Sequence, residues 1–98
     1  MKISHVINGT ELTVKLEGRL DSATSGEFSD FIEEHFVGDI NDLMLDFADV
    51  DFISSKGLRV LVTIFKNLGN RKMEIINANS SVVDVLRVSG LLKIFTLQ

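Results

Sequence analysis

The chain contains no cysteine and no proline among its 98 residues. Without cysteine it forms no disulfide bond and offers no thiolate ligand to a metal ion. Without proline, the slow isomerisation of an X–Pro peptide bond is absent from its folding. We therefore expect a fold that is stabilised by side-chain packing alone.

Long apolar runs are also missing from the sequence. No stretch approaches the roughly 20 apolar residues that a transmembrane helix needs. The first ten residues, MKISHVINGT, lack the apolar block of a secretory signal peptide. We expect a cytoplasmic protein that does not bind a membrane.

The motifs of several common enzyme classes do not occur. The sequence has no GxxxxGKS or GxxxxGKT phosphate-binding loop, no GxGxxG and no HExxH. A serine nucleophile at Ser55 would lack an evident histidine base. His5 and His35 are the only histidines, and a zinc site takes three or four ligands. We therefore expect no enzymatic activity, no cofactor and no bound metal.

Length and composition are those of one small domain, since 45% of the 98 residues are hydrophobic and 24% are charged. The net charge of −4 is unevenly distributed. Residues 1–51 have 3 Lys or Arg and 12 Asp or Glu, whereas residues 52–98 have 7 and 2. The acidic half is unsuited to nucleic acid and can steer a basic partner. Alternatively, the basic second half lies beside it and compensates its charge.

Two segments near the N-terminus predict a β-hairpin. Lys2–Ile7 and Glu11–Glu17 flank an Asn-Gly dipeptide, the strongest short hairpin signal, and apolar residues alternate along the second segment. A helix should follow, because Thr24 and Glu27 have the spacing of a capping box and apolar residues then recur at helical intervals. These apolar residues are Phe28, Phe31, Ile32 and Phe36.

The rest of the chain predicts alternating strands and helices. Asp42–Phe47 has the apolar run of an interior parallel strand. A helix with a regular apolar stripe ends at Gly69, Lys72–Asn77 is a strand, a short helix follows Asn79, and Lys93–Leu97 is the last strand. This order predicts an α/β fold with a mixed sheet of four to five strands, an antiparallel N-terminal hairpin and about three helices.

The most informative stretch is FISSKGLRVL at residues 52–61, where an apolar strand passes into an apolar helix. Ser54 and Ser55 stand at the helix N-terminus, where a hydroxyl caps a free N–H group and an anion is tolerated. Ser55 is therefore a candidate for capping, for phosphorylation, or for both in turn. Glycine inside a first helical turn costs about 1 kcal/mol relative to alanine. Gly57 either relieves crowding against the neighbouring strand or lets a partner approach the backbone closely.

This stretch resembles the characteristic motif of STAS domains of the anti-sigma factor antagonist family. Two further segments resemble the family in the same order. Residues 18–21, GRLD, are similar to its Gly-x-Leu-Asp, and residues 89–95, SGLLKIF, are similar to its C-terminal segment. The three matches span essentially the whole chain and predict one STAS domain over residues 1–98. The resemblance implies that Ser55, two residues before the glycine, is the phosphorylated serine.

The resemblance further implies a partner-switching protein. Its unphosphorylated form would bind and sequester an anti-sigma factor with serine kinase activity, and so release a sigma factor. Phosphorylation of Ser55 would end this binding, and a serine phosphatase acting on phospho-Ser55 would restore it. The implied partner-binding residues are Asp21, Ser54, Ser55, Lys56, Gly57 and Arg59.

Two residues depart from the familiar members of the family. These members have aspartate in place of Ser54, and serine, threonine or alanine in place of Lys56. We expect Lys56 to face solvent, since a lysine in the first turn opposes the helix dipole. The departures leave open a second interpretation, in which the chain is a STAS interaction subunit of a lipid transporter or a sensory complex without a phosphoswitch.

Overall fold

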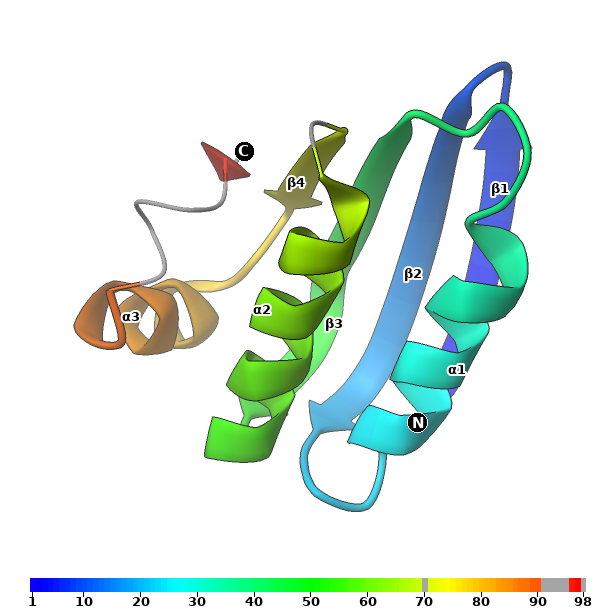
Figure 1. Ribbon diagram of the computed structural model, residues 1–98. Helices are drawn as coiled ribbons and strands as arrows, with labels where there is room; N and C mark the ends of the chain where they lie inside the picture. The colour runs from blue at the N-terminus through cyan, green and yellow to red at the C-terminus, as the bar shows by residue number, and fades with distance from the viewer. Residues whose placement is uncertain (70, 91–95, 98) are drawn as a thin grey trace.

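The computed structural model describes residues 1–69, 71–90 and 96–97. The strands are β1 (Lys2–Asn8), β2 (Glu11–Leu20), β3 (Asp42–Ile53), β4 (Lys72–Ile76) and β5 (Thr96–Leu97), and the helices are α1 (Ser25–His35), α2 (Ser55–Leu68) and α3 (Ser80–Val88) (Figure 1). The predicted α/β class, N-terminal hairpin and three helices are confirmed. Most of the predicted strand Lys93–Leu97 lies outside the described residues, which include its last two.

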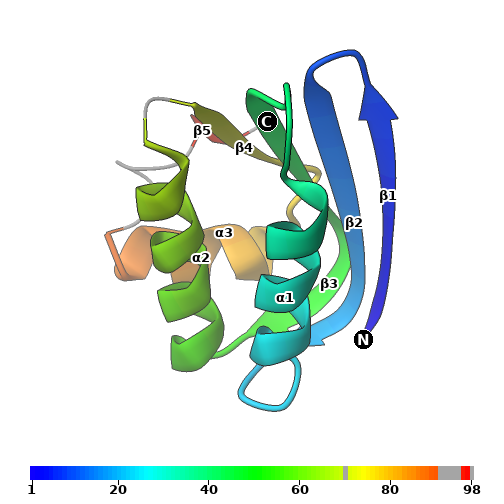
Figure 2. The same ribbon diagram turned by 45° about the vertical axis from the view of Figure 1, so that its right-hand side comes forward.

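The strands form one sheet in the order β1-β2-β3-β4-β5. β1 and β2 are antiparallel, and every later pair of neighbours is parallel. Right-handed crossovers that advance in one direction leave their helices on the same face. Accordingly, α1 and α2 lie side by side over one face of the sheet (Figures 1 and 2). α3 packs against β3, and Asn79 at its N-terminus donates a hydrogen bond to the carbonyl oxygen of Val50 at 3.0 Å.

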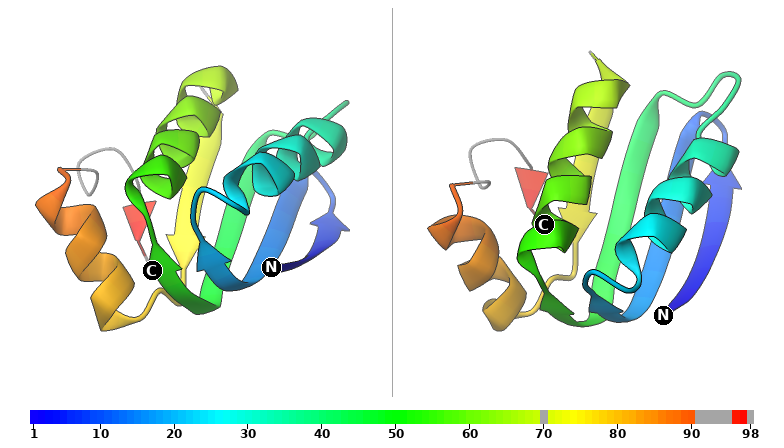
Figure 3. Two further views of the ribbon diagram at one scale, coloured as in Figure 1. Left: turned by 90° about the horizontal axis from the view of Figure 1, so that it is seen from below. Right: turned by 60° about the horizontal axis from the view of Figure 1, so that its bottom comes forward.

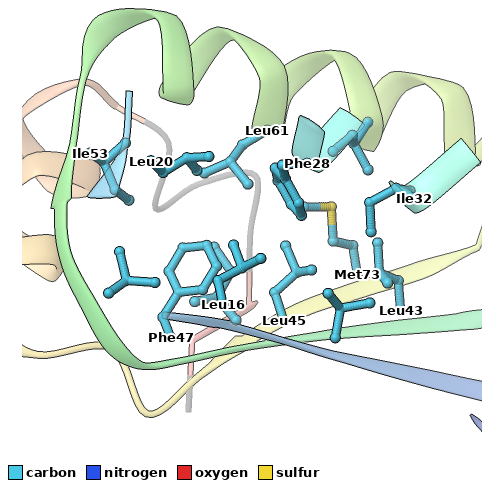
Figure 4. Packing of buried hydrophobic residues seen from close by; sticks show 14 of the residues in the cluster. Leu16, Leu20, Phe28, Ile32, Leu43, Leu45, Phe47, Ile53, Leu61 and Met73 are labelled. Atoms are coloured by element: carbon cyan, nitrogen blue, oxygen red, sulfur yellow. The ribbon is translucent and has the colours of Figure 1, made fainter. Parts of the chain in front are cut away.

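The hydrophobic core fills the space between the sheet and the helices (Figure 4). Alternate residues of β2 are buried on this face, and α1 adds Phe28 and Ile32. Leu61, Ile64 and Leu68 cover the same core from α2. This shared core holds α1 and α2 on the sheet.

β3 is longer than the sequence predicts. It continues past Phe47 to Ile53, and two register shifts in its pairing with β2 each place one extra residue in β3. Such bulges interrupt the alternation of apolar residues. This interruption is why the strand seemed to end at Phe47, and the predicted end is wrong.

The capping box predicted for the first helix does not form. Thr24 has a helical backbone with φ −109° and ψ −14°, and its side chain makes no cap hydrogen bond. Its hydroxyl instead donates to the carbonyl oxygen of Arg19 at 2.7 Å. The turn before α1 is held by Asp21, whose carboxylate accepts from the backbone N–H of Ala23 and of Thr24 at 3.0 and 3.2 Å.

Candidate functional site

The predicted site lies at one edge of the sheet, where β2 and β3 both end. Leu20 and Ile53 are register partners at the last positions of these parallel strands. Asp21 therefore follows β2 at the same edge at which Ser54 and Ser55 follow β3. The turn before α1 and the first turn of α2 are both seen at this edge in Figure 3. The fold brings together segments that are more than thirty residues apart in the sequence.

Ser54 caps α2. Its backbone is extended, with φ −86° and ψ 172°, and its hydroxyl accepts a hydrogen bond from the backbone N–H of Gly57 at 3.1 Å. Its own N–H donates to the carbonyl oxygen of Leu20 at 2.9 Å. The cap is thus tied to the end of β2, so the start of α2 is fixed by the sheet.

Ser55 is the first residue of α2 and is exposed. Its hydroxyl makes no hydrogen bond to any residue that the structure describes. Serine is a favourable capping residue at either position, but only Ser54 caps α2. The hydroxyl of Ser55 is left at the positive end of a helix, facing solvent.

Gly57 is buried, and its glycine is required by packing within the chain. A Cβ atom added there would lie 2.5 Å from the carbonyl oxygen of Leu20 and 3.2 Å from Cγ2 of Ile53. This finding favours the first of the two interpretations of Gly57, relief of crowding against a strand. The residue is covered by its own chain and supports the surface around Ser55 from beneath.

Asp21 is engaged in its own loop. Partial burial raises the pKa of its carboxyl group, but hydrogen bonds from Ala23, Thr24 and Arg19 outweigh that effect, and the pKa lies below its ordinary value. The carboxylate therefore stays charged at neutral pH while it holds the turn before α1. Its side chain is 27% exposed, which leaves part of it on the surface.

Lys56 and Arg59 are exposed, as predicted for Lys56. Neither forms an ion pair with another residue in the described ranges, and the first turn of α2 contains no acidic residue. Arg59 stands four residues after Ser55, and residues at this spacing share one face of a helix. The exposed serine is thus accompanied by two cations that pair with no described acidic residue.

Arg19 and Phe52 belong to the same edge, although the sequence did not suggest them as site residues. The second bulge in β3 makes them register partners, and the Arg19 guanidinium carbon lies 4.4 Å from the centroid of the Phe52 ring. Phe52 is 41% exposed. Arg19 Nε also lies 3.5 Å from Asp21 Oδ2. The pairing was hidden because the sequence did not predict the two bulges in β3 that set this register.

Among the described residues, no group of three or more potential ligands is placed to hold a metal ion. The His35 ring stacks on Phe31 with centroids 4.1 Å apart, and the His5 ring lies tilted against His35 with centroids 4.2 Å apart. No helix in the described ranges is long and apolar enough to cross a membrane.

The family model for the STAS domain matches residues 2–98, and the chain therefore belongs to the STAS domain family. No curated protein sequence matches the chain. Among solved structures, an anti-sigma factor antagonist from Mycobacterium paratuberculosis is 21% identical with a TM-score of 0.89, and the match covers 98% of this chain and 83% of that one.

Two other solved structures have the same fold. The unphosphorylated anti-sigma factor antagonist SpoIIAA is 18% identical with a TM-score of 0.84, over 99% of this chain and 88% of its own. The murine anion transporter Slc26a9 is 18% identical with a TM-score of 0.76, over 86% of this chain but 14% of its own. At these identities the likeness is one of fold.

Proposed function

We propose that this chain is a cytoplasmic anti-sigma factor antagonist that acts by binding and not by catalysis. Its unphosphorylated form binds an anti-sigma factor with serine kinase activity and so releases a sigma factor. The kinase transfers phosphate to Ser55, which ends the binding, and a serine phosphatase removes the phosphate. Membership of the STAS family and the shared fold with solved antagonists support this proposal.

The observation that carries the proposal is the division of roles between the two serines. Ser54 makes the cap hydrogen bond, and Ser55 has an exposed hydroxyl beside it. A phosphate on Ser55 therefore breaks no hydrogen bond within the described part of the chain. The serine is suited to repeated modification because its state has little effect on the fold.

The binding surface in this proposal surrounds Ser55 at the edge where β2 and β3 end. Phe52 supplies an exposed ring with Arg19 over its face, and arginine and aromatic side chains are enriched among residues that dominate binding energy. Lys56 and Arg59 add exposed cations, and Asp21 adds a partly exposed carboxylate. Gly57 contributes to this surface indirectly, because its lack of a side chain lets the first turn of α2 lie close to Leu20.

Long-range electrostatics supports a basic or mixed partner. Every ion pair between described residues joins two residues of the same half of the chain, either 1–51 or 52–98. Between described residues no ion pair joins the acidic half to the basic half, although, besides Glu74, Asp42 and Glu11 contribute to the raised pKa of Lys72. The remaining charge of the acidic half is available to steer an approaching protein.

Phosphate on Ser55 adds about −1.5 to −2 charges at pH 7. Within the chain it meets a helix N-terminus and reaches Arg59 across one turn, so it is tolerated there. At the interface the same group is a desolvated dianion that also draws Arg59 away from the partner. A cost of about 3 kcal/mol corresponds to a loss in affinity of roughly a hundredfold.

The test uses the chain with an anti-sigma factor encoded beside it. Incubation with ATP and phosphate mapping by mass spectrometry should place the phosphate on Ser55. Calorimetry should give persistent binding for Ser55→Ala and weak binding for Ser55→Asp, with Ser54→Ala as the control that changes the cap. Equal affinities for the two position-55 variants, or phosphate on Ser54, would contradict the proposal.

A second candidate function is a STAS interaction subunit of a transporter or sensory complex without a phosphoswitch. The similarity of this fold to part of the Slc26a9 anion transporter is the observation that supports this second candidate. In that case no phosphate is incorporated at Ser55, and Ser55→Asp binds its partner as tightly as the unmodified chain.

A further inference from the structure

β1 forms an open edge of the sheet. Its seven residues, Lys2–Asn8, pair with β2 without a register shift, and no described strand pairs with its other side. Edge strands are commonly protected by proline, by bulges or by inward-pointing charges. β1 has no proline and no bulge, and Lys2 is its one charged residue apart from a histidine. Val6 and Ile7 are 65% and 52% exposed.

The hairpin geometry determines which backbone groups of β1 face outward. Asn8 and Glu11 are register partners across a two-residue turn. The pair that flanks such a turn exchanges hydrogen bonds, and alternate pairs do so along the ladder. The N–H and C=O groups of Ile3, His5 and Ile7 therefore point away from β2, toward the open edge.

The outward-facing set is symmetric about His5. If two copies of β1 pair antiparallel over their full length, His5 faces His5 of the second copy and Ile3 faces Ile7. Every outward N–H or C=O group of one strand then meets an outward group of the other. Lys2 comes opposite Asn8, so no charged side chains of like sign oppose each other at the ends of the strand.

We propose that the chain self-associates through β1, with two copies joined antiparallel about a twofold axis at His5 into one continuous sheet. A second copy is the occupant that fits, because the pattern of this strand is complementary to itself. Ile3 and Ile7 share the face of His5, since alternate residues of a strand point to one side. Two Ile–Ile pairs therefore flank the axis and bury the exposed side chain of Ile7.

The proposed contact between two copies does not cover the site around Ser55. That site lies at the ends of β2 and β3, whereas the new contact runs along the outer side of β1. The twofold axis makes the two β2 strands antiparallel to each other, so the two Ser55 residues lie at opposite ends of the joined sheet. The inference does not rest on the proposed function, and its test needs no anti-sigma factor.

A cross-linking experiment tests the register directly. The chain has no cysteine, so His5→Cys introduces a single thiol. Cα atoms of a hydrogen-bonded antiparallel pair lie about 5.5 Å apart, within the range of about 4.4–6.8 Å that a disulfide needs. Mild oxidation should link two copies of His5→Cys. The control Ser4→Cys, one residue away and off the axis, should link far less.

Sedimentation of the unmodified chain measures the association itself. A dimer should form, and His5→Pro should weaken it by at least about tenfold, since it removes an outward N–H group without touching the ladder to β2. Ile7→Lys should do the same by placing a charge beside the axis. Val88→Lys, the same kind of change at an exposed residue of α3, should leave the dimer intact.

Three results would overturn the inference. One is an unmodified chain that stays monomeric up to about 1 mM. The second is equal cross-linking of His5→Cys and Ser4→Cys, and the third is a dimer that resists both His5→Pro and Ile7→Lys. Circular dichroism of each variant separates a lost dimer from a lost fold.

Discussion

Replacing Gly57 with alanine tests how the start of α2 is fixed. In a free helix the change would stabilise by about 1 kcal/mol. Here the new Cβ would lie 2.5 Å from the Leu20 carbonyl oxygen, a backbone atom that also accepts the Ser54 N–H. Overpacking costs about 1–3 kcal/mol, and we take the upper value because backbone moves less readily than a side chain. The net loss is about 2 kcal/mol.

Urea unfolding and thermal melting measure this loss. For a domain of this size, about 2 kcal/mol lowers the melting temperature by about 8–16 °C. Gly26→Ala is the matched control, because Gly26 also lies in the first turn of a helix but has nothing within 4 Å of the added Cβ. That variant should be as stable as the unmodified chain, or more stable by up to about 1 kcal/mol.

The comparison of the two glycines decides the point. If Gly57→Ala is as stable as Gly26→Ala, the close approach of Leu20 does not constrain α2. If both variants lose stability equally, the cause is an effect of alanine on the unfolded chain, or an effect common to the first turn of any helix. A loss confined to Gly57→Ala identifies the contact with β2 as its cause.

Three further predictions concern the same edge. Ser54→Ala should lower the free energy of unfolding by about 1 kcal/mol through loss of the cap, whereas Ser55→Ala should change it by less than about 0.5 kcal/mol, as urea titration can show. Because the pKa of Asp21 is lowered in the fold, its carboxylate adds stability that is fully present above the ordinary value of 3.8 and is lost as the pH falls through the folded-state value. The stability difference between the unmodified chain and Asp21→Asn, followed by urea unfolding at several pH values, should therefore shrink below pH 3.8. Phe52→Ala should weaken binding to an anti-sigma factor by at least about tenfold in calorimetry, with little change in melting temperature; unchanged affinity would remove Phe52 and Arg19 from the proposed surface.

Local patterns predicted the elements of this fold well. The Asn-Gly turn, the apolar stripe of α2 and the apolar run of β3 each depend on neighbouring residues, and each is confirmed. The end of β3 was missed because two bulges break the alternation on which strand prediction depends. The pairing of Arg19 with Phe52 follows from those bulges and was therefore missed with them.

Prediction of the site was limited in the same way, by contacts between residues that are distant in the sequence. The sequence placed Ser54, Ser55 and Gly57 at a helix N-terminus, and that placement is correct. It left open which serine caps the helix, because both residue types suit the position. The decision depends on where the carbonyl of Leu20 stands, more than thirty residues earlier in the chain. The sequence also left open why residue 57 is glycine, because the answer depends on the same carbonyl group of Leu20.

The cap at Ser54 has a consequence for how this protein can evolve. Folding depends on Ser54 and Gly57, whereas modification in the proposed switch depends on their neighbour Ser55. A lineage can therefore lose phosphorylation, mimic it with an acidic residue, or regain it through single substitutions at position 55, and each intermediate keeps a folded domain. Regulation by this edge is open to rapid change while the architecture beneath it is held constant.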